Sequence, residues 1–137
     1  MRVLIDTDIV LDFFLDRKPF SDEATKIFAL CEAKRVQGFI TPVICSNVYY
    51  ILRQTASHER IIEKLNLLMN FIGVLDMGRG TIIQALGSGF RDFEDALQHY
   101  SAVQSDFIDG ILTRNVKDFK KSEIGVLTPE GFLGIIT

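Results

Sequence analysis

Acidic side chains stand where apolar segments of this sequence end and where an amphipathic pattern begins. Asp6 directly follows the apolar residues 1–5, and a cluster of acids opens a helical pattern near residue 92: Asp92, Glu94 and Asp95. Asp118 follows a polar stretch, residues 113–115, that leaves a second apolar segment. Open α/β sheets place their sites beyond the carboxyl ends of their strands, so we expect Asp6, Asp95 and Asp118 to converge. Carboxylates gathered without a basic partner favour a hard divalent cation.

Phosphodiester hydrolysis is the chemistry that such a pocket suits. The reaction needs an activated water, a neutralised phosphate and a stabilised leaving oxygen, and metal ions supply all three. Mg²⁺ is usually held by one or two carboxylates and several waters, which fits a sparse site. His58 and His99 are isolated on expected helices, and no serine, cysteine or histidine arrangement offers a competing nucleophile.

Each acid also has an ordinary structural interpretation. Asp8 is a plausible N-cap of the helix that follows it, and we favour that role over a metal ligand. Acids in a first helical turn, as at residues 92–95, are favoured by the helix dipole and usually have no other role. Asp6 differs, because a carboxylate that closes a buried strand must be stabilised by a cation, hydrogen bonds or helix N-termini. Asp6 and Asp118 together therefore favour a site.

Short apolar strands and amphipathic helices alternate along the chain. The expected strands are residues 1–5, 38–41, 73–76, 107–112 and 124–127. The expected helices begin near residues 8, 21, 42, 58, 78 and 91, and a short helical turn follows residue 128. This order predicts an α/β fold, a doubly wound three-layer α/β/α domain with a mainly parallel sheet of four to five strands. We expect one domain over residues 1–137.

Composition narrows the class of protein further. The chain has 137 residues, 47% of them hydrophobic, which is ample for one core. It contains no apolar run of about 20 residues and no signal-peptide pattern, and Cys31 and Cys45 match no zinc or redox spacing. We therefore expect a cytoplasmic protein, not a membrane protein, with reduced cysteines. The net charge of −3 disfavours nucleic-acid binding unless the acids are concentrated in a metal site.

Several of these segments together resemble the PIN domain, the nuclease fold of VapC-type toxins in bacterial toxin–antitoxin pairs. The segments are I-D-T at the first strand, D-F-E-D-A-L, T-R-N-x-K-D-F and the terminal L-T-P-E-G-F-L. Each is weak alone, but their order and spacing are fairly specific, and they span essentially the whole chain. The resemblance implies a Mg²⁺- or Mn²⁺-dependent ribonuclease that cleaves RNA.

The resemblance also assigns roles to individual residues. Asp6, Asp95 and Asp118 match the acidic positions of the family, and Asp92, one helical turn before Asp95, joins the site through a metal-bound water. Thr113 and Asn115 stand where the family has polar residues that orient ligands and water. Asn47 is a departure, because the family usually has a glutamate there. An amide oxygen can coordinate but adds no charge, so the second metal should bind more weakly and the activity is in question.

Contacts with RNA and with proteins are a further expectation. Arg114 is either a buried partner of one of these acids or a phosphate contact, and Lys117 belongs to a candidate basic rim with Arg53, Arg91, Lys120 and Lys121. The early helices carry more large apolar residues than one sheet face needs: Phe13, Phe14, Phe20, Tyr49, Tyr50 and Phe71. We expect this surplus to support a two-fold homodimer. The resemblance adds a cognate antitoxin bound in a groove of these helices.

Two other functions compete with the nuclease. With Asn47 in place of an acid, the domain could be a non-catalytic module that binds RNA or protein and retains a degenerate metal site. Asp6-Thr7-Asp8 also resembles the D-x-D signature of haloacid-dehalogenase-type phosphatases, in which the first aspartate is phosphorylated. That family needs a later lysine and a longer chain, and Lys117 is a poor match.

Overall fold

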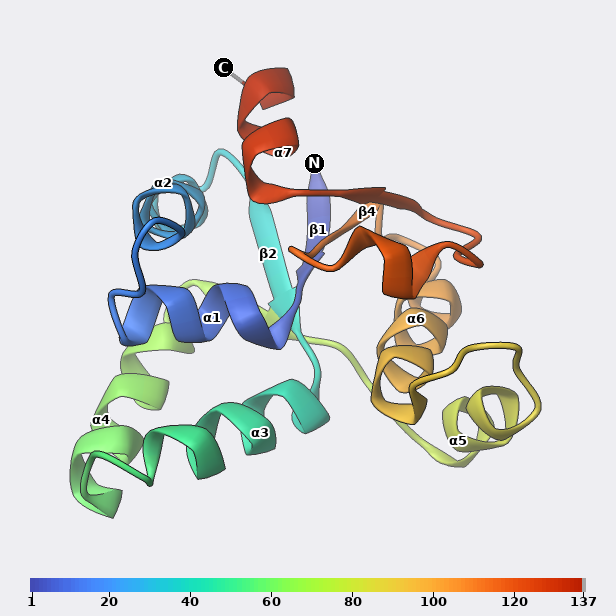
Figure 1. Cartoon of the computed structure of the whole chain (residues 1–137), viewed down its shortest axis with the longest axis horizontal. Coiled ribbons are helices and arrows are strands. Elements are labelled where there is room, and N and C mark those ends of the chain that lie inside the picture. The colour runs from blue at the N-terminus through green and yellow to red at the C-terminus, as the bar shows by residue number, and fades with distance from the viewer. Residues whose placement is uncertain (137) are drawn as a thin grey trace.

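Five parallel strands form the centre of the structure, a computed structural model that describes residues 1–136 (Figure 1). The strand order across the sheet is β3-β2-β1-β4-β5, and every neighbouring pair is parallel. The strands are β1 (Arg2–Ile5), β2 (Gln37–Ile40), β3 (Ile72–Val74), β4 (Gly110–Leu112) and β5 (Gly125–Leu127). In the centre, Val3 on β1 is in register with Gly38 on one side and Gly110 on the other, so β1 and β4 end side by side.

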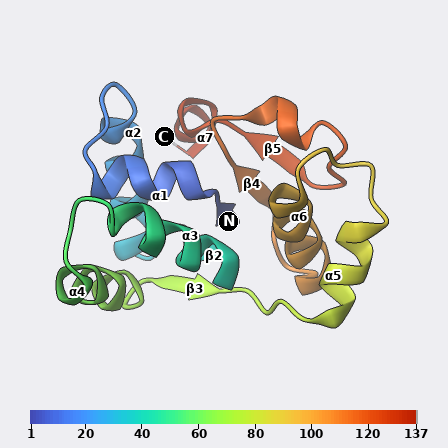
Figure 2. The same ribbon diagram turned by 60° about the horizontal axis from the view of Figure 1, so that its bottom comes forward.

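Helices cover both faces of the sheet. The helices are α1 (Thr7–Phe14), α2 (Ser21–Glu32), α3 (Pro42–Leu52), α4 (His58–Leu68), α5 (Arg79–Leu86), α6 (Phe93–Ser105) and α7 (Pro129–Ile136), with a 3₁₀ turn, η1 (Val116–Phe119). Figures 1 and 2 show α1–α4 on one side and α5 and α6 on the other. This follows from right-handed crossovers, because the chain steps outward from β1 to β3 and then returns to β4. The doubly wound α/β fold predicted from the sequence is confirmed.

The strands are apolar because both faces of the sheet are covered. Val3, Leu4 and Ile5 are completely buried, as are Ile111 and Leu112. The sheet also packs closely: a Cβ at Gly38 would lie 2.8 Å from Cys31 Sγ and 2.9 Å from the Ile5 and Ile72 side chains. Cys31 and Cys45 are both free, as expected. Within residues 1–136, none of the helices combines the length and the apolar character that a bilayer span requires.

Several element boundaries differ from the sequence-based expectation. Asp6, not Asp8, is the N-cap of α1, because its carboxylate accepts a hydrogen bond from Thr7 N. The expected strand 107–112 is shorter, since Asp109 accepts a hydrogen bond from Arg2 N and only Gly110–Leu112 pairs in the sheet. The turn expected after residue 128 is the full helix α7, whose Phe132 is buried. The short turn η1 was not predicted, because four residues of 3₁₀ helix carry no periodic signal.

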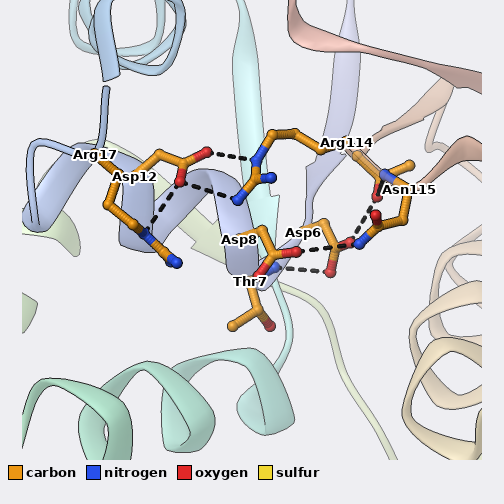
Figure 3. Close-up of polar contacts among 8 residues, drawn as sticks. Asp6, Thr7, Asp8, Asp12, Arg17, Arg114 and Asn115 are labelled. Atoms are coloured by element: carbon orange, nitrogen blue, oxygen red, sulfur yellow. Dashed lines mark hydrogen bonds and ion pairs between the residues drawn. The ribbon is translucent and has the colours of Figure 1, made fainter. Parts of the chain in front are cut away.

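A buried ion pair joins α1 to the loop that follows β4 (Figure 3). Asp12 is 1% exposed, and Arg114 donates to it from Nε over 2.8 Å and from Nη2 over 3.2 Å. Arg17 Nε lies 3.2 Å from the same carboxylate, and the Arg114 guanidinium stacks 4.0 Å from the centre of the Phe20 ring. Arg114 is thus the half-buried partner of a buried acid, but of Asp12 rather than of the acids that follow the strands.

Replacing Arg114 with methionine should destabilise the fold because Asp12 would keep only Arg17 as a partner. Loss of one member of a buried pair typically costs about 3–5 kcal/mol, and we expect about 3 kcal/mol here because Arg17 remains. Urea unfolding at pH 7 measures the change, with Arg60→Met on the exposed side of α4 as the matched control. A loss below about 0.5 kcal/mol, the range of ordinary surface changes, would show that the pair does not hold α1 in place.

Candidate functional site

Asp6 is held at the point where β1 ends and α1 begins. Its Oδ1 accepts a hydrogen bond from Thr7 N over 2.8 Å, and its Oδ2 accepts one from Thr113 Oγ1 over 2.7 Å. Thr113 itself is completely buried at the end of β4, so the hydrogen bond ties the two strand ends together. Asp6 is 6% exposed, and burial raises its pKa from 3.8 to about 6, although both hydrogen bonds oppose that rise.

The loop after β4 brings a second polar pair to the same edge. Asn115 Nδ2 donates to Asp8 Oδ2 over 3.1 Å, and Asn115 N donates to Thr113 Oγ1 over 3.0 Å (Figure 3). The Thr113 hydroxyl therefore accepts from the loop and donates to Asp6. Asp118 follows on η1, where its own N–H donates to Asn115 O over 3.0 Å. Thr113 thus orients Asp6 from within the core.

The first turn of α6 supplies the remaining acids. Asp92 is the N-cap and accepts a hydrogen bond from Asp95 N over 2.9 Å. Burial raises the pKa of Asp95 from 3.8 to about 7, and the charges of Asp92, Asp6, Asp118 and Glu94 add to the rise. Burial also raises the pKa of Glu94. Asp6 and Asp118 influence Asp95 from separate segments, so strand and helix acids share one electrostatic environment.

One open pocket of about 410 Å³ collects most of the residues expected in the site. Its lining includes Asp6, Asp92, Asp95, Asp118, Asn47 and Asn115, together with Thr7, Asp8, Tyr50, Ile51 and Glu94. Of the expected residues, Thr113 lies beneath the pocket, Arg114 is engaged by Asp12, and Lys117 lines a neighbouring pocket. Asp8 and Glu94 were interpreted from the sequence as parts of helix starts. Two features of the sequence could have drawn attention to Glu94. It directly precedes Asp95, and Asn47 stands where the family usually has a glutamate.

The donor set of this pocket suits a hydrated hard cation. Within residues 1–136, no three His, Cys, Asp or Glu side chains are arranged closely enough to hold a metal ion as they stand. Both Asp6 oxygens accept hydrogen bonds, and Asp92 caps α6, so a tight chelating triad is not preformed. Most of the oxygen donors in the lining nevertheless belong to carboxylates and amides, and the pocket has room for water. Mg²⁺ has this preference, since it keeps several waters and uses one or two carboxylates.

A second pocket with basic walls adjoins the acidic one. It measures about 520 Å³ and shares Asp92 and Asp118 with the first pocket. Its other lining residues include four cations: Arg91, Lys117, Lys120 and Lys121. Of the expected basic rim, only Arg53 lies elsewhere, at the end of α3, where Nη1 donates to Ala56 O over 3.1 Å.

An apolar groove of about 410 Å³ lies between α1, α2 and α4. Three of the early aromatic residues line it, Phe13, Phe14 and Phe71, with Phe28, Leu67 and Leu68. Lys64 lies 5.7 Å from the centre of the Phe14 ring, and Glu32 also belongs to the lining. The other large aromatics are dispersed, because Phe20 stacks on Arg114 and Tyr49 contacts His58. The early helices therefore form a groove rather than one continuous aromatic surface.

Comparison with known proteins agrees with this architecture. The family model for the PIN domain matches residues 2–117. No curated protein sequence matches the chain.

Solved structures with the same fold include three from bacterial toxin–antitoxin systems. A toxin–antitoxin complex from Klebsiella pneumoniae has a TM-score of 0.69 and 22% identity, and the match covers 93% of this chain and 97% of that chain. VapBC-1 from nontypeable Haemophilus influenzae has a TM-score of 0.69 and 15% identity over 95% of this chain and 99% of that chain. Mycobacterium tuberculosis VapC20, a toxin that cleaves the sarcin–ricin loop, has a TM-score of 0.62 and 12% identity over 80% of this chain and 86% of that chain.

The raised pKa values of Asp6 and Asp95 predict an unusual dependence of stability on pH. The folded state holds protons up to about pH 6 on Asp6 and about pH 7 on Asp95, whereas both carboxyls ionise near 3.8 when unfolded. The folded protein therefore binds more protons between pH 4 and 7, and this contribution to stability is lost as the pH rises through that window. For the buried Asp6, a shift of about two units corresponds to about 3 kcal/mol.

Urea unfolding between pH 4.5 and 8 in the presence of EDTA measures this effect as the difference between wild type and Asp6→Asn. Asparagine keeps the shape of the side chain and one of its two acceptors but does not titrate, so the wild type should lose stability relative to Asp6→Asn as the pH rises. Excess Mg²⁺ should reduce this loss, because a cation favours the ionised carboxylate. Parallel pH profiles for the two proteins would contradict the assignment of Asp6 as a destabilised carboxylate.

Proposed function

The chain belongs to the PIN domain family, and from this we propose that it is a metal-dependent endoribonuclease that cleaves RNA phosphodiester bonds as a VapC-like toxin. The observation that carries the proposal is the pocket at the carboxyl edge of the sheet, where Asp6, Asp92, Asp95 and Asp118 meet. Within residues 1–136 no acid of this pocket forms an ion pair with a basic side chain. A divalent cation, Mg²⁺ or Mn²⁺, would supply the missing positive charge.

The residues of the acidic pocket would have different roles in the reaction. Asp6, Asp95 and Asp118 would hold the cation, with Asp92 acting through a water and Asn47 and Asn115 orienting ligands. When bound, the cation would neutralise the phosphate and activate the attacking water. Asp6 is kept in one orientation by Thr113 and by the backbone of Thr7, so its position does not depend on the cation. With a pKa raised to about 7, Asp95 is partly protonated near neutral pH in the free protein, so cation binding should release protons.

The basic pocket supports RNA as the substrate. A polyanion placed in the acidic pocket alone would be repelled, whereas Arg91, Lys117, Lys120 and Lys121 lie on the far side of Asp92 and Asp118. The RNA backbone would follow these cations, as it follows the positive groove of proteins that track single strands, while the scissile phosphate approaches the acids. Lys117 is the member expected from the sequence. Arg114 has a structural role instead, because Asp12 and Phe20 occupy its guanidinium.

Protein partners form a further part of the proposal. Two of the similar structures are toxin–antitoxin assemblies, and the groove between α1, α2 and α4 has the apolar lining that suits the apolar face of an amphipathic helix. We propose that a cognate antitoxin binds there.

The homodimer would use another surface, the α5 side chains Ile82, Ile83 and Leu86, which are 45%, 54% and 71% exposed. An exposed apolar face of this kind marks an interface in soluble proteins.

A non-catalytic binding module is the second candidate function, and two observations favour it. Asn47 replaces an acid in the pocket lining, and residues 1–136 contain no preformed group of three metal ligands. Such a module would bind RNA through the basic pocket without cleaving it, and divalent cations would not change the RNA product. Metal-dependent cleavage of RNA separates the two functions.

Replacing Asp95 with asparagine should abolish metal-dependent cleavage because it removes charge from the centre of the acidic pocket. We expect a single-stranded RNA to be cut by the wild type with Mn²⁺ or Mg²⁺ and not with EDTA, and the mutant rate to fall by roughly 100-fold or more. Asp106→Asn, at the opposite end of α6, is the matched control and should retain full activity. Equal cleavage by the Asp95 variant would remove Asp95 from the site, and no cleavage by the wild type with either cation would reject the nuclease assignment.

Light scattering over a dilution series tests the homodimer. The wild type should give the dimer mass, and Leu86→Glu should shift it toward the monomer because a charge would be buried at the interface. Leu67→Glu is the matched control, since Leu67 is also an exposed leucine, 57% exposed, but lines the groove on α4. A monomer at every concentration would remove the homodimer. If only Leu67→Glu dissociates the dimer, the dimer interface lies at the groove and not on α5.

A further inference from the structure

The acidic pocket contains a carboxylate that the roles assigned above leave unused. Glu94 lines the same pocket as Asp6, Asp95 and Asn47. It is half-buried in the first turn of α6, between the N-cap Asp92 and the ligand candidate Asp95. Neighbouring residues of a helix point in directions about 100° apart. Glu94 and Asp95 nevertheless both line the pocket, because α6 begins at the carboxyl edge of the sheet.

Three polar side chains surround the Glu94 carboxylate. Gln98, one turn further along α6 and completely buried, donates from Nε2 to Glu94 Oε1 over 3.4 Å. The side chains of Asn47 on α3 and Thr7 on α1 also lie close enough to lower the pKa of Glu94 by hydrogen bonding, against the effect of burial. Residues from three separate helices thus orient one carboxylate toward the pocket.

Thr7 provides an independent sign that the pocket takes a ligand. Its side chain is 8% exposed and lines the pocket, and its Oγ1 has no partner in full hydrogen-bonding geometry. Glu94 is near enough to be influenced by this hydroxyl but does not satisfy it. A buried hydroxyl left unpaired is destabilising, and a water in the shell of a bound cation would give it a partner.

We infer that Glu94, oriented by Asn47, supplies the carboxylate that the helix after the second strand lacks in this chain. The inference rests on the proposed metal site and adds a residue to it. Asn47 is then a positioning residue, because a neutral amide can donate to Glu94 whereas a glutamate at position 47 would repel it. The negative charge of the site is kept but is placed on α6 instead of α3.

This arrangement makes the two positions interdependent. Glu94→Gln, which keeps the shape and removes the charge, should weaken Mn²⁺ binding about tenfold. Asn47→Glu alone should bring no gain in affinity, because the new carboxylate would face Glu94 across the pocket. The double variant Glu94→Gln/Asn47→Glu should recover most of the lost affinity, since it moves the carboxylate back to α3. Independent positions would show additive effects.

Isothermal titration calorimetry with Mn²⁺ alone, at pH 7, measures all four proteins, with Glu123→Gln as an exposed control outside the pocket. Urea unfolding verifies that each variant is folded. If Glu94→Gln binds Mn²⁺ with the same affinity as the wild type, this inference is overturned while the metal site stands. A gain in Asn47→Glu alone, or no recovery in the double variant, would overturn the pairing of the two residues. No Mn²⁺ binding by the wild type would reject both the metal site and the inference.

Discussion

The hydrogen bond between Thr113 and Asp6 fixes the edge of the sheet at which the acidic side chains of this protein gather. β1 and β4 are neighbours because the chain returns from β3 across the sheet. Two hydrogen bonds then join the ends of these strands: Thr113 Oγ1 donates to Asp6 Oδ2 over 2.7 Å, and Asp6 N donates to Leu112 O over 3.0 Å. A carboxylate that is 6% exposed could not be kept there without such donors. The Asp12–Arg114 pair secures the same junction from the other side, because it holds α1 against the loop that carries Asn115.

Electrostatic repulsion is the cost of this arrangement. The acids of the pocket come from the end of β1, the start of α6 and η1, and the chain as a whole carries a net charge of −3. Two helix N-termini reduce the repulsion, since Asp6 caps α1 and Asp92 caps α6. The raised pKa values of Asp6 and Asp95 show that the compensation is incomplete. A site that is destabilised without its ligand is a common feature of functional pockets, and a bound cation would relieve the repulsion.

The sequence was sufficient for the architecture and for the acids at the strand ends. Buried parallel strands are continuous apolar runs, so their order and the location of Asp6 and Asp118 could be predicted. Two features could not be. Asp12 and Arg114 are 102 residues apart, and neither helical periodicity nor composition indicates that they pair. The direction of Glu94 depends on how α6 meets α3, a tertiary packing angle that local patterns do not contain. Asp8 was misassigned as a cap because the helix begins two residues earlier than its apolar pattern, which starts at Ile9.

The central claim is that the acids at the carboxyl edge of the sheet hold a divalent cation. Crystals grown with Mn²⁺ and measured near its absorption edge test this claim most directly, because anomalous scattering locates the ion independently of activity. The account predicts an anomalous peak within the pocket, bounded by Asp6, Asp95 and Asp118 and coordinated by carboxylate oxygens and waters. An empty pocket at saturating Mn²⁺, or a peak only at acids outside it, would contradict the claim.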